Sequence, residues 1–313
     1  MCGIAGIIYR DGGGERHVGR DMTAMLQAMK HRGPDSTGYA LYRPESDGYV
    51  MHVKLAEANG HGGEDFELAG RLRRQRSEIE SRLGKAGATI SSIGGTSDHA
   101  MTVLFGFDGD LKRLADYVED VRGAEVLSLG RSLEIVKDLG DAESVHEQYG
   151  LAKFTGTHAI GHVRMATESE VDIAGAHPYW AYPYSDVAVV HNGQLTNYFM
   201  WRRRLERAGR RFMSECDSEI IAVYLAEEMT NGASLEEAMH KSLDELDGVF
   251  TYIAVTQDEL GVAKDELAAK PLVLYESDDL VALASEEIAI QQLVDHEIDT
   301  YDPYEREVLV WQR

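Results

Sequence analysis

Residues 1–10 read MCGIAGIIYR and place one of the chain's two cysteines, Cys2, directly before a short apolar run. The run at 3–9 is rich in isoleucine and ends in tyrosine, a composition that predicts a first β-strand. An isolated cysteine here would be read as a small apolar residue at the edge of that strand. The meaning of Cys2 therefore depends on what the rest of the chain supplies.

Composition limits the class of protein. The 313 residues, 43% of them hydrophobic, are enough for one large domain or two smaller ones. Fifty-four acidic and 31 basic residues give a net charge of −23, which disfavours nucleic acid and anionic membranes as partners. Two cysteines cannot build a disulfide framework, and we find neither a leader pattern nor a run of about 18 apolar residues, so we expect a cytoplasmic protein.

Periodicity predicts a mixed α and β chain. We expect a helix at 18–30 and another at 234–248, where Ser234 and Glu237 have the spacing of a capping box. Residues 56–150 are richer in glycine and charge, with an exposed helix inside, and we interpret them as an insertion in a single domain over 2–313. Apolar, β-branched runs predict further strands at 37–43, 49–55, 100–106, 158–163, 187–191, 249–255, 271–275, 280–284 and 308–311.

Short motifs identify the family. Besides MCGIAGI at 1–7, the chain contains HRGPDSTG at 31–38, GHVRMAT at 161–167, VVHNGQLTNY at 189–198 and CDSEI at 216–220. In this order the motifs resemble the class II glutamine amidotransferases, and the resemblance extends to the Ala-Ser-Glu that ends at Glu286. It implies an α+β chain with the four-layer αββα fold of N-terminal-nucleophile hydrolases, in which two antiparallel sheets stack between helices.

The resemblance implies a nucleophilic role for Cys2. A carboxamide is a poor electrophile, so its hydrolysis needs a strong nucleophile, a base and donors for the oxyanion. If Met1 is removed, Cys2 gains a free α-amino group with a pKa near ~8 that can take the thiol proton. By resemblance, Cys2 forms a γ-glutamyl thioester with glutamine, ammonia leaves, and water releases glutamate.

Two further positions match the family's catalytic and substrate-binding residues. Asn192 and Gly193 follow an apolar strand and correspond to the family's oxyanion hole, although an isolated Asn-Gly pair would suggest only a turn. Arg164 would hold the α-carboxylate of glutamine through two parallel hydrogen bonds, a geometry that lysine cannot reproduce. A surface ion pair is the alternative for Arg164.

Three other residues complete the expected site. Asp217 would bind the α-ammonium of glutamine, although an aspartate before a helix can also be only its N-cap. We expect Thr167 in the same pocket, and Arg32 near substrate in the loop beside Cys2, where a helix-ending turn explains the motif equally well. Glu168 stands where many relatives have histidine, so detailed pocket contacts differ from theirs.

We expect no metal in this chain, because the histidines lack the spacing of a compact ligand motif. Core or pocket positions suit them better. The histidines in apparent strands are His158, His162, His177 and His191.

The chain resembles most the stand-alone glutaminase subunit of multisubunit glutamate synthases, including N-methylglutamate synthases. Such a subunit passes ammonia to a separate subunit that carries FMN and iron-sulfur clusters, so we expect no cofactor here and consider the insertion at 56–150 a docking surface. Two alternatives stay open: another N-terminal-cysteine amidase, or a regulatory subunit that senses glutamine without hydrolysing it. Recognition of a free amino acid by Arg164 and Asp217 argues against the first. The intact set of Cys2, Asn192 and Gly193 argues against the second, which a retained Met1 would keep open.

Overall fold

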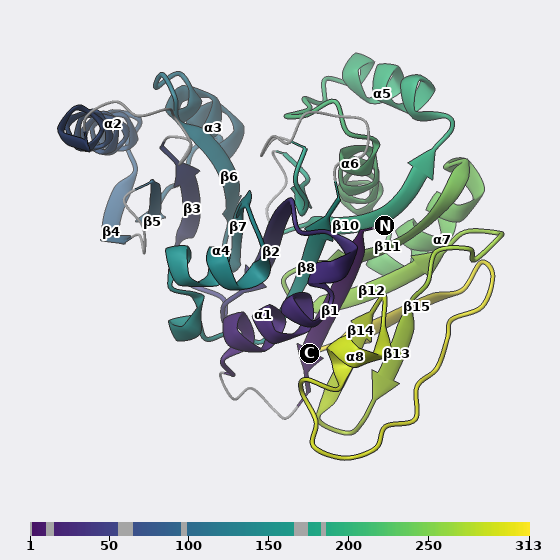
Figure 1. Cartoon of the computed structure of the whole chain (residues 1–313). Coiled ribbons are helices and arrows are strands. Elements are labelled where there is room, and N and C mark those ends of the chain that lie inside the picture. Colours follow the sequence, from purple (N-terminus) through teal and green to yellow (C-terminus); the bar gives the residue numbers. More distant parts are fainter. Residues whose placement is uncertain (1, 11–15, 56–64, 95–98, 166–174, 183–185) are drawn as a thin grey trace.

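The computed structural model describes most of the chain, and Figure 1 shows its arrangement. The described residues are 2–10, 16–55, 65–94, 99–165, 175–182 and 186–313.

A six-stranded antiparallel sheet contains the first strand. Its order is β13-β14-β1-β8-β2-β7, so β1 lies at its centre between two strands from much later in the sequence. All but the last residue of β1 are buried, because both faces of the sheet are covered. The strands are β1 (Gly3–Tyr9), β2 (Ser36–Tyr42), β7 (Leu133–Leu139), β8 (His158–Arg164), β13 (Val273–Glu276) and β14 (Leu280–Ala284).

A second antiparallel sheet of five strands has the order β15-β12-β11-β10-β9. It stacks on the first sheet where Gly6 of β1 faces Ile253 and Leu260, and a Cβ at Gly6 would touch both side chains. Glycine in β1 therefore allows the two sheets to approach closely. The strands are β9 (Tyr179–Trp180), β10 (Ala188–Leu195), β11 (Gly248–Val255), β12 (Glu259–Lys264) and β15 (Val308–Gln312).

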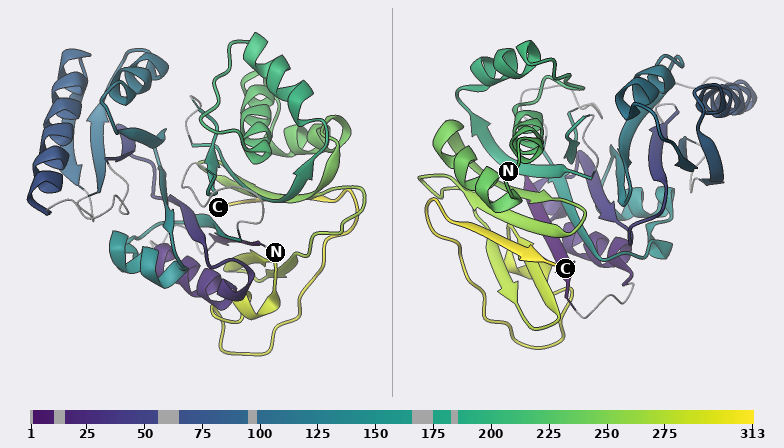
Figure 2. Two further views of the ribbon diagram at one scale, coloured as in Figure 1. Left: turned by 45° about the horizontal axis from the view of Figure 1, so that its top comes forward. Right: turned by 180° about the vertical axis from the view of Figure 1, so that it is seen from behind.

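Helices cover the outer faces of both sheets (Figures 1 and 2). On the six-stranded sheet lie α1 (Val18–Ala28), α4 (Ala142–Tyr149) and α8 (Glu287–Ile290), together with two short 3-10 helices at Lys30–Arg32 and Leu151–Lys153. On the five-stranded sheet lie α6 (Asp217–Thr230) and α7 (Leu235–Glu245), and α5 (Tyr198–Arg207) packs on α6. The layers confirm the expected αββα arrangement, and the capping box of Ser234 and Glu237 is formed at α7.

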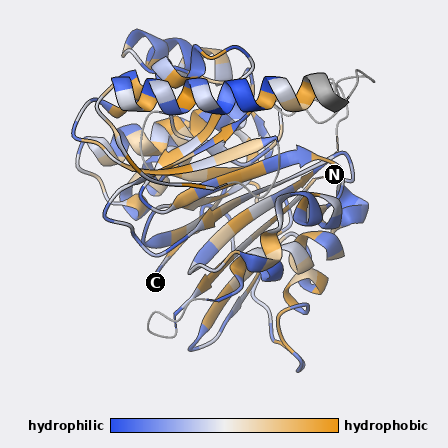
Figure 3. Ribbon diagram, turned by 90° about the vertical axis from the view of Figure 1, so that its left-hand side faces the viewer, coloured by the Kyte–Doolittle hydropathy of each residue, from blue (hydrophilic) through white to orange (hydrophobic). Residues whose placement is uncertain are grey.

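A smaller unit projects from one side of this four-layer body (Figure 2). It is a four-stranded sheet of order β4-β5-β3-β6, covered by two helices. Figure 3 shows α2 as a largely hydrophilic helix, and its buried residues Leu72, Ile79 and Leu83 join the core of the sheet. The elements are β3 (Tyr49–Lys54), α2 (Asp65–Lys85), β4 (Thr89–Gly94), β5 (Ala100–Gly106), α3 (Leu111–Glu119) and β6 (Glu125–Gly130).

The strands of the small sheet define bounds for this unit that differ from the insertion at 56–150 expected from the sequence. Strand β3 belongs to it, whereas β7 and α4 belong to the six-stranded sheet and its helical layer. The unit therefore spans 49–130, and residues 56–64 and 95–98 within it lie outside the described residues. No helix among the described ranges is long and apolar enough to cross a membrane.

His158 in β8 is fully buried as a neutral imidazole. Its ring stacks on Tyr42 at 4.3 Å, its Nδ1 lies 2.8 Å from the Thr157 hydroxyl, and its Nε2 lies 2.8 Å from the Thr256 carbonyl oxygen. These partners suit one donating and one accepting ring nitrogen. Burial lowers the pKa of His158 to about 4, because a charged ring loses its hydration there.

This burial predicts a loss of stability in mild acid. The unfolded chain binds the proton near the ordinary value of 6.5, so the free energy of unfolding falls as pH drops from about 6.5 to about 4. By about pH 5 we expect a loss of about 2 kcal/mol from this group. Urea unfolding measures this dependence. Between neutral pH and pH 5, the free energy of unfolding should fall less in His158→Gln than in His240→Gln, whose histidine is exposed. Equal falls in the two variants would show that His158 is not the cause.

Candidate active site

Cys2 lies just before β1 and is held by three segments distant in sequence. Its Sγ is 3.4 Å from the backbone nitrogen of Met165, which follows β8. Its carbonyl oxygen accepts hydrogen bonds from Arg32 Nε at 3.0 Å and from Asn192 Nδ2 at 3.2 Å. The side chain is half-buried, so the thiol is neither freely mobile nor enclosed in the core.

The HRGPD loop explains how Arg32 reaches Cys2. The short 3-10 helix at 30–32 directs the buried Arg32 inward, and its guanidinium also pairs with Glu286 at 2.5 Å. Burial acts to raise the pKa of Glu286, but hydrogen bonds from Arg32 and His31 outweigh it and lower that pKa. Gly33 packs directly on the backbone of Arg164, where a Cβ would overlap. The contacts of Arg32 are thus with the chain itself, and binding of substrate by Arg32 stays a prediction.

Asn192 and Gly193 lie within β10, in register with Thr251 and Phe250 of β11. The Asn192 amide is buried and also approaches the Ser285 hydroxyl at 3.4 Å. Gly193 has a φ of 138°, and a Cβ there would overlap the Val249 carbonyl oxygen. Only glycine suits this position, because the conformation and the close strand both exclude a side chain.

A cavity of about 710 Å³ opens beside these residues, and Arg164 and Asp217 both line it. Asp217 is the first residue of α6, after Cys216 as the N-cap, so its carboxylate does not act as the cap. Instead, one Asp217 oxygen accepts a hydrogen bond from the Leu195 backbone N–H at 2.7 Å, which ties α6 to the end of β10. Among the described residues, the second oxygen has only long contacts, of 3.5 Å or more, to neighbouring side chains.

Glu219 shapes another wall of the cavity, although the sequence assigned it no role. It is buried in the first turn of α6 and accepts hydrogen bonds from the backbone nitrogens of Met213 and Ser214, at 2.6 and 2.8 Å. Burial raises the pKa of Glu219. These bonds fix the 213–214 segment, which lines the cavity.

Three buried histidines form a cluster at the cavity, and one of them, His177, lines it. His162 and His177 stack at 4.0 Å, and both His177 Nε2 and His191 Nδ1 lie 2.7 Å from the Ser218 hydroxyl. Burial lowers the pKa of all three, so the neutral rings are favoured. They occupy core or pocket positions, as expected, but several ring nitrogens have no hydrogen-bond partner among the described residues.

The structure brings most of the expected site residues together. Cys2 contacts Arg32 and Asn192 directly, while Arg164 and Asp217 share the cavity wall. Two chain neighbours join these groups: Met165 follows Arg164 and contacts Cys2, and the cavity-lining Gln194 follows Gly193. The described lining of the cavity does not include Cys2 or Asn192, and Thr167 lies outside the described residues. Within the described part of the chain, no cluster of three or more His, Cys, Asp or Glu side chains could hold a metal.

Sequence comparison identifies the family. Over 286 residues the chain is 37% identical to a protein of Methanothermobacter thermautotrophicus named "Putative glutamine amidotransferase", covering 90% of each chain. This chain belongs to the glutamine amidotransferases. It is also 36% identical to the glutamine amidotransferase-like protein GlxB of Rhizobium meliloti, over 90% of this chain and 88% of that one. A family model described as "Glutamine amidotransferase domain" matches residues 162–292.

Structural comparison agrees with the fold. The glutamine phosphoribosylpyrophosphate amidotransferase of B. subtilis superimposes with a TM-score of 0.60 at 18% identity, covering 99% of this chain and 47% of that one. This similarity shows the fold of an N-terminal-nucleophile hydrolase. This chain spans about half the length of that solved relative.

Proposed function

We propose that this amidotransferase hydrolyses L-glutamine to L-glutamate and ammonia through a γ-glutamyl thioester on Cys2. One observation carries the proposal: Arg164 and Asp217, which have opposite charges, both line one cavity beside the thiol. A free amino acid presents a carboxylate and an ammonium group at one end, so these two side chains match both. Met165, adjacent to Arg164, contacts the Cys2 sulfur, which supports attack near the clamped substrate.

The proposed reaction uses the chain's own groups. After Met1 is removed, the α-amino nitrogen of Cys2 takes the thiol proton, and the sulfur attacks the side-chain amide carbon of glutamine. Asn192 Nδ2 and the Gly193 N–H stabilise the oxyanion, and a donor of this kind is worth ~100- to 1000-fold in turnover. The same amine returns its proton to the leaving nitrogen, so ammonia departs and water then cleaves the thioester.

The remaining expected residues support this reaction less directly. Arg32, paired with Glu286 at 2.5 Å, positions the carbonyl of Cys2. Thr167 is retained as a proposed pocket residue. We regard 2–313 as one glutaminase domain with an inserted unit, located in the cytoplasm and without a cofactor of its own.

The proposed acceptor of the ammonia is a separate glutamate-synthase-like subunit that carries FMN and iron-sulfur clusters. Support comes from the resemblance of the motifs and from two large apolar side chains on α5. Phe199 lines the cavity and is 70% exposed, and its neighbour Met200 is 53% exposed. Exposed apolar groups at the edge of a site are typical of a surface that another protein covers.

The test compares the isolated chain with its native complex. We expect slow glutamine hydrolysis by the chain alone and a faster rate with the partner and its electron donor, because contact with the partner orders the loops around the thioester. The measurement is glutamate release at saturating glutamine. Full activity of the lone chain, or purification from its host without a flavin-containing protein, would contradict the coupled function and favour a free-standing amidase. Glutamine binding without turnover in both preparations would favour the sensing role.

A further inference from the structure

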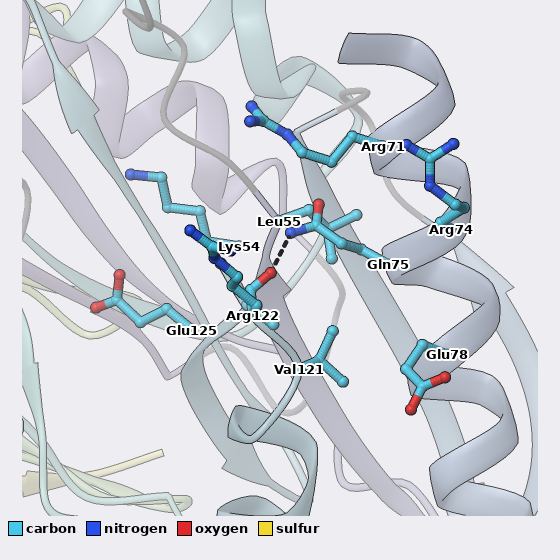
Figure 4. A pocket seen from close by; sticks show the side chains of 11 residues that line it. Lys54, Leu55, Arg71, Arg74, Gln75, Glu78, Val121, Arg122 and Glu125 are labelled. Atoms are coloured by element: carbon cyan, nitrogen blue, oxygen red, sulfur yellow. Dashed lines mark hydrogen bonds between the residues drawn. The ribbon is translucent and has the colours of Figure 1, made fainter. Parts of the chain in front are cut away.

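A second cavity, of about 1170 Å³, lies in the inserted unit between α2 and the edge formed by β3 and β6 (Figure 4). Its described lining shares no residue with the glutamine cavity. Four cationic side chains line it, Lys54, Arg71, Arg74 and Arg122, against two carboxylates, Glu78 and Glu125. This excess of positive charge is unusual in a chain whose net charge is −23.

Lys54 is the most informative of these cations, because buried lysines normally have partners. Three described lysines are buried. Lys264, 2% exposed, pairs with Asp302 at 2.9 Å, and Lys137, 7% exposed, donates to the Ala176 carbonyl oxygen at 3.2 Å. Lys54 is only 4% exposed, and no described residue forms a hydrogen bond or ion pair with its ammonium group. Lys54 therefore lacks a pairing anion among the described residues, and it lines the cavity, where a bound anion would meet its charge.

Glu125 does not supply that anion. It lies directly opposite Lys54 in the register of β3 and β6, yet the two side chains form no ion pair. The Glu125 charge also acts on Lys137, where it favours the charged form and opposes the burial that lowers the pKa of Lys137. One of the two carboxylates of the cavity is therefore already shared with a cation outside it.

Gln75 adds a second unpartnered polar group. It is 7% exposed, and its Nε2 donates to the Arg122 carbonyl oxygen at 2.8 Å, which fixes the turn that carries Arg122 against α2. Its Oε1 is buried and has no hydrogen-bond partner among the described residues. An unpartnered buried acceptor is unfavourable, so the site suits a ligand that brings a donor.

The side chains are arranged around one space. Figure 4 shows the nitrogen-bearing ends of Lys54, Arg71 and Arg122 on the same side of Gln75, whereas Arg74 points away from them. Arg71 and Gln75 are four residues apart on α2 and so face the same way. From this geometry we propose that the inserted unit binds a small hydroxylated polyanion, with Lys54, Arg71 and Arg122 on its carboxylate or phosphate groups and Gln75 Oε1 accepting from its hydroxyl.

Isothermal titration of the full chain at low salt tests the proposal. Citrate and glucose 6-phosphate are the probes, one for hydroxylated carboxylates and one for hydroxylated phosphates. We expect at least one to bind at millimolar concentration or below, with weaker binding as salt rises. Arg71→Gln and Arg122→Gln should each weaken binding about tenfold or more, the size expected for a lost charge-assisted hydrogen bond. Lys54→Met should do the same if it folds, and the two arginine variants suffice if it does not.

The matched control is Arg113→Gln, which removes one positive charge from the exposed face of α3, outside the cavity. If the control weakens probe binding as much as the cavity variants do, the proposed site is wrong, because binding then depends only on the overall charge of the chain. Absence of binding for both probes would also overturn it and would leave an acidic protein segment as the better occupant. Tricarballylate, which lacks the hydroxyl of citrate, should bind more weakly than citrate, and equal binding would remove Gln75 from the proposal.

Discussion

Replacing Cys2 with alanine should lower glutamine hydrolysis by about 10⁴-fold or more, because the proposed thioester forms on its sulfur. The second cysteine is a poor substitute. Burial, followed by the charge of Asp217, raises the pKa of Cys216, so little of its thiolate exists at neutral pH. A glutamine-like electrophile should therefore label one thiol, and peptide mapping should locate the label on Cys2.

Two controls separate loss of the nucleophile from other causes. In Cys216→Ser the label should still be on Cys2, because the Cys216 thiol takes no part in the reaction. Intact-mass measurement of the native protein should show that Met1 is absent, since a retained methionine would acylate the amine that serves as base. Label on Cys216, or glutamine turnover that survives Cys2→Ala, would disprove the assignment.

The sequence predicted strands formed by long apolar runs, and it missed several whose runs are short or are interrupted by polar residues. Strand β1 was predicted to the residue, whereas β7 was not, because Glu134 and Asp138 interrupt its apolar pattern. In the fold, Asp138 accepts from the Tyr149 hydroxyl at 2.8 Å, and Glu134 pairs with Arg43 at 3.0 Å. Such partners come from distant segments, so a local pattern cannot reveal that these charges are compensated.

The inserted unit illustrates the same limit at a larger scale. Residues 49–55 were predicted correctly as a strand, but nothing local indicates that β3 pairs with β5 and β6 in a sheet of its own. The boundary at 56 followed the change in composition, whereas the structural boundary follows the pairing. The register that places Lys54 opposite Glu125 is likewise a property of the folded chain alone.

At the candidate site, the motifs supplied the residues that we propose to contact substrate, and the structure added residues that hold them. Ser285 and Glu286 belong to a stretch that resembled the family but had no assigned role, and they contact Asn192 and Arg32. Glu219 is part of the CDSEI motif. The sequence feature that could have indicated a role for it is a single acidic residue directly before an apolar helical run. Contact between Cys2 and Met165 is through the backbone, so the identity of residue 165 carries little information about it.

The second large effect is expected at Arg164 and Asp217, whose proposed partners are the charged groups of glutamine. Arg164→Ala and Asp217→Asn should each lower kcat/KM for glutamine. The loss should correspond to about 2–5 kcal/mol of transition-state stabilisation, because each variant leaves one substrate charge unpaired in the cavity. Asparagine is the better replacement for Asp217, since its amide oxygen can still accept from the Leu195 N–H that ties α6 to β10. Arg164→Lys should also be impaired, because an ammonium cannot make two parallel hydrogen bonds to a carboxylate.

Reactivity of Cys2 distinguishes loss of substrate binding from a damaged site. Iodoacetamide carries neither an α-carboxylate nor an α-ammonium group, so it should alkylate Cys2 at the same rate in the parent and in both variants. Arg203→Gln is the matched control, because Arg203 is exposed on α5 and lies outside the cavity lining. Its kcat/KM for glutamine should stay within about twofold of the parent. An unchanged kcat/KM in Arg164→Ala would remove Arg164 from the substrate site, whereas slower alkylation together with lost turnover would show that the cavity wall holds the thiol rather than the amino acid.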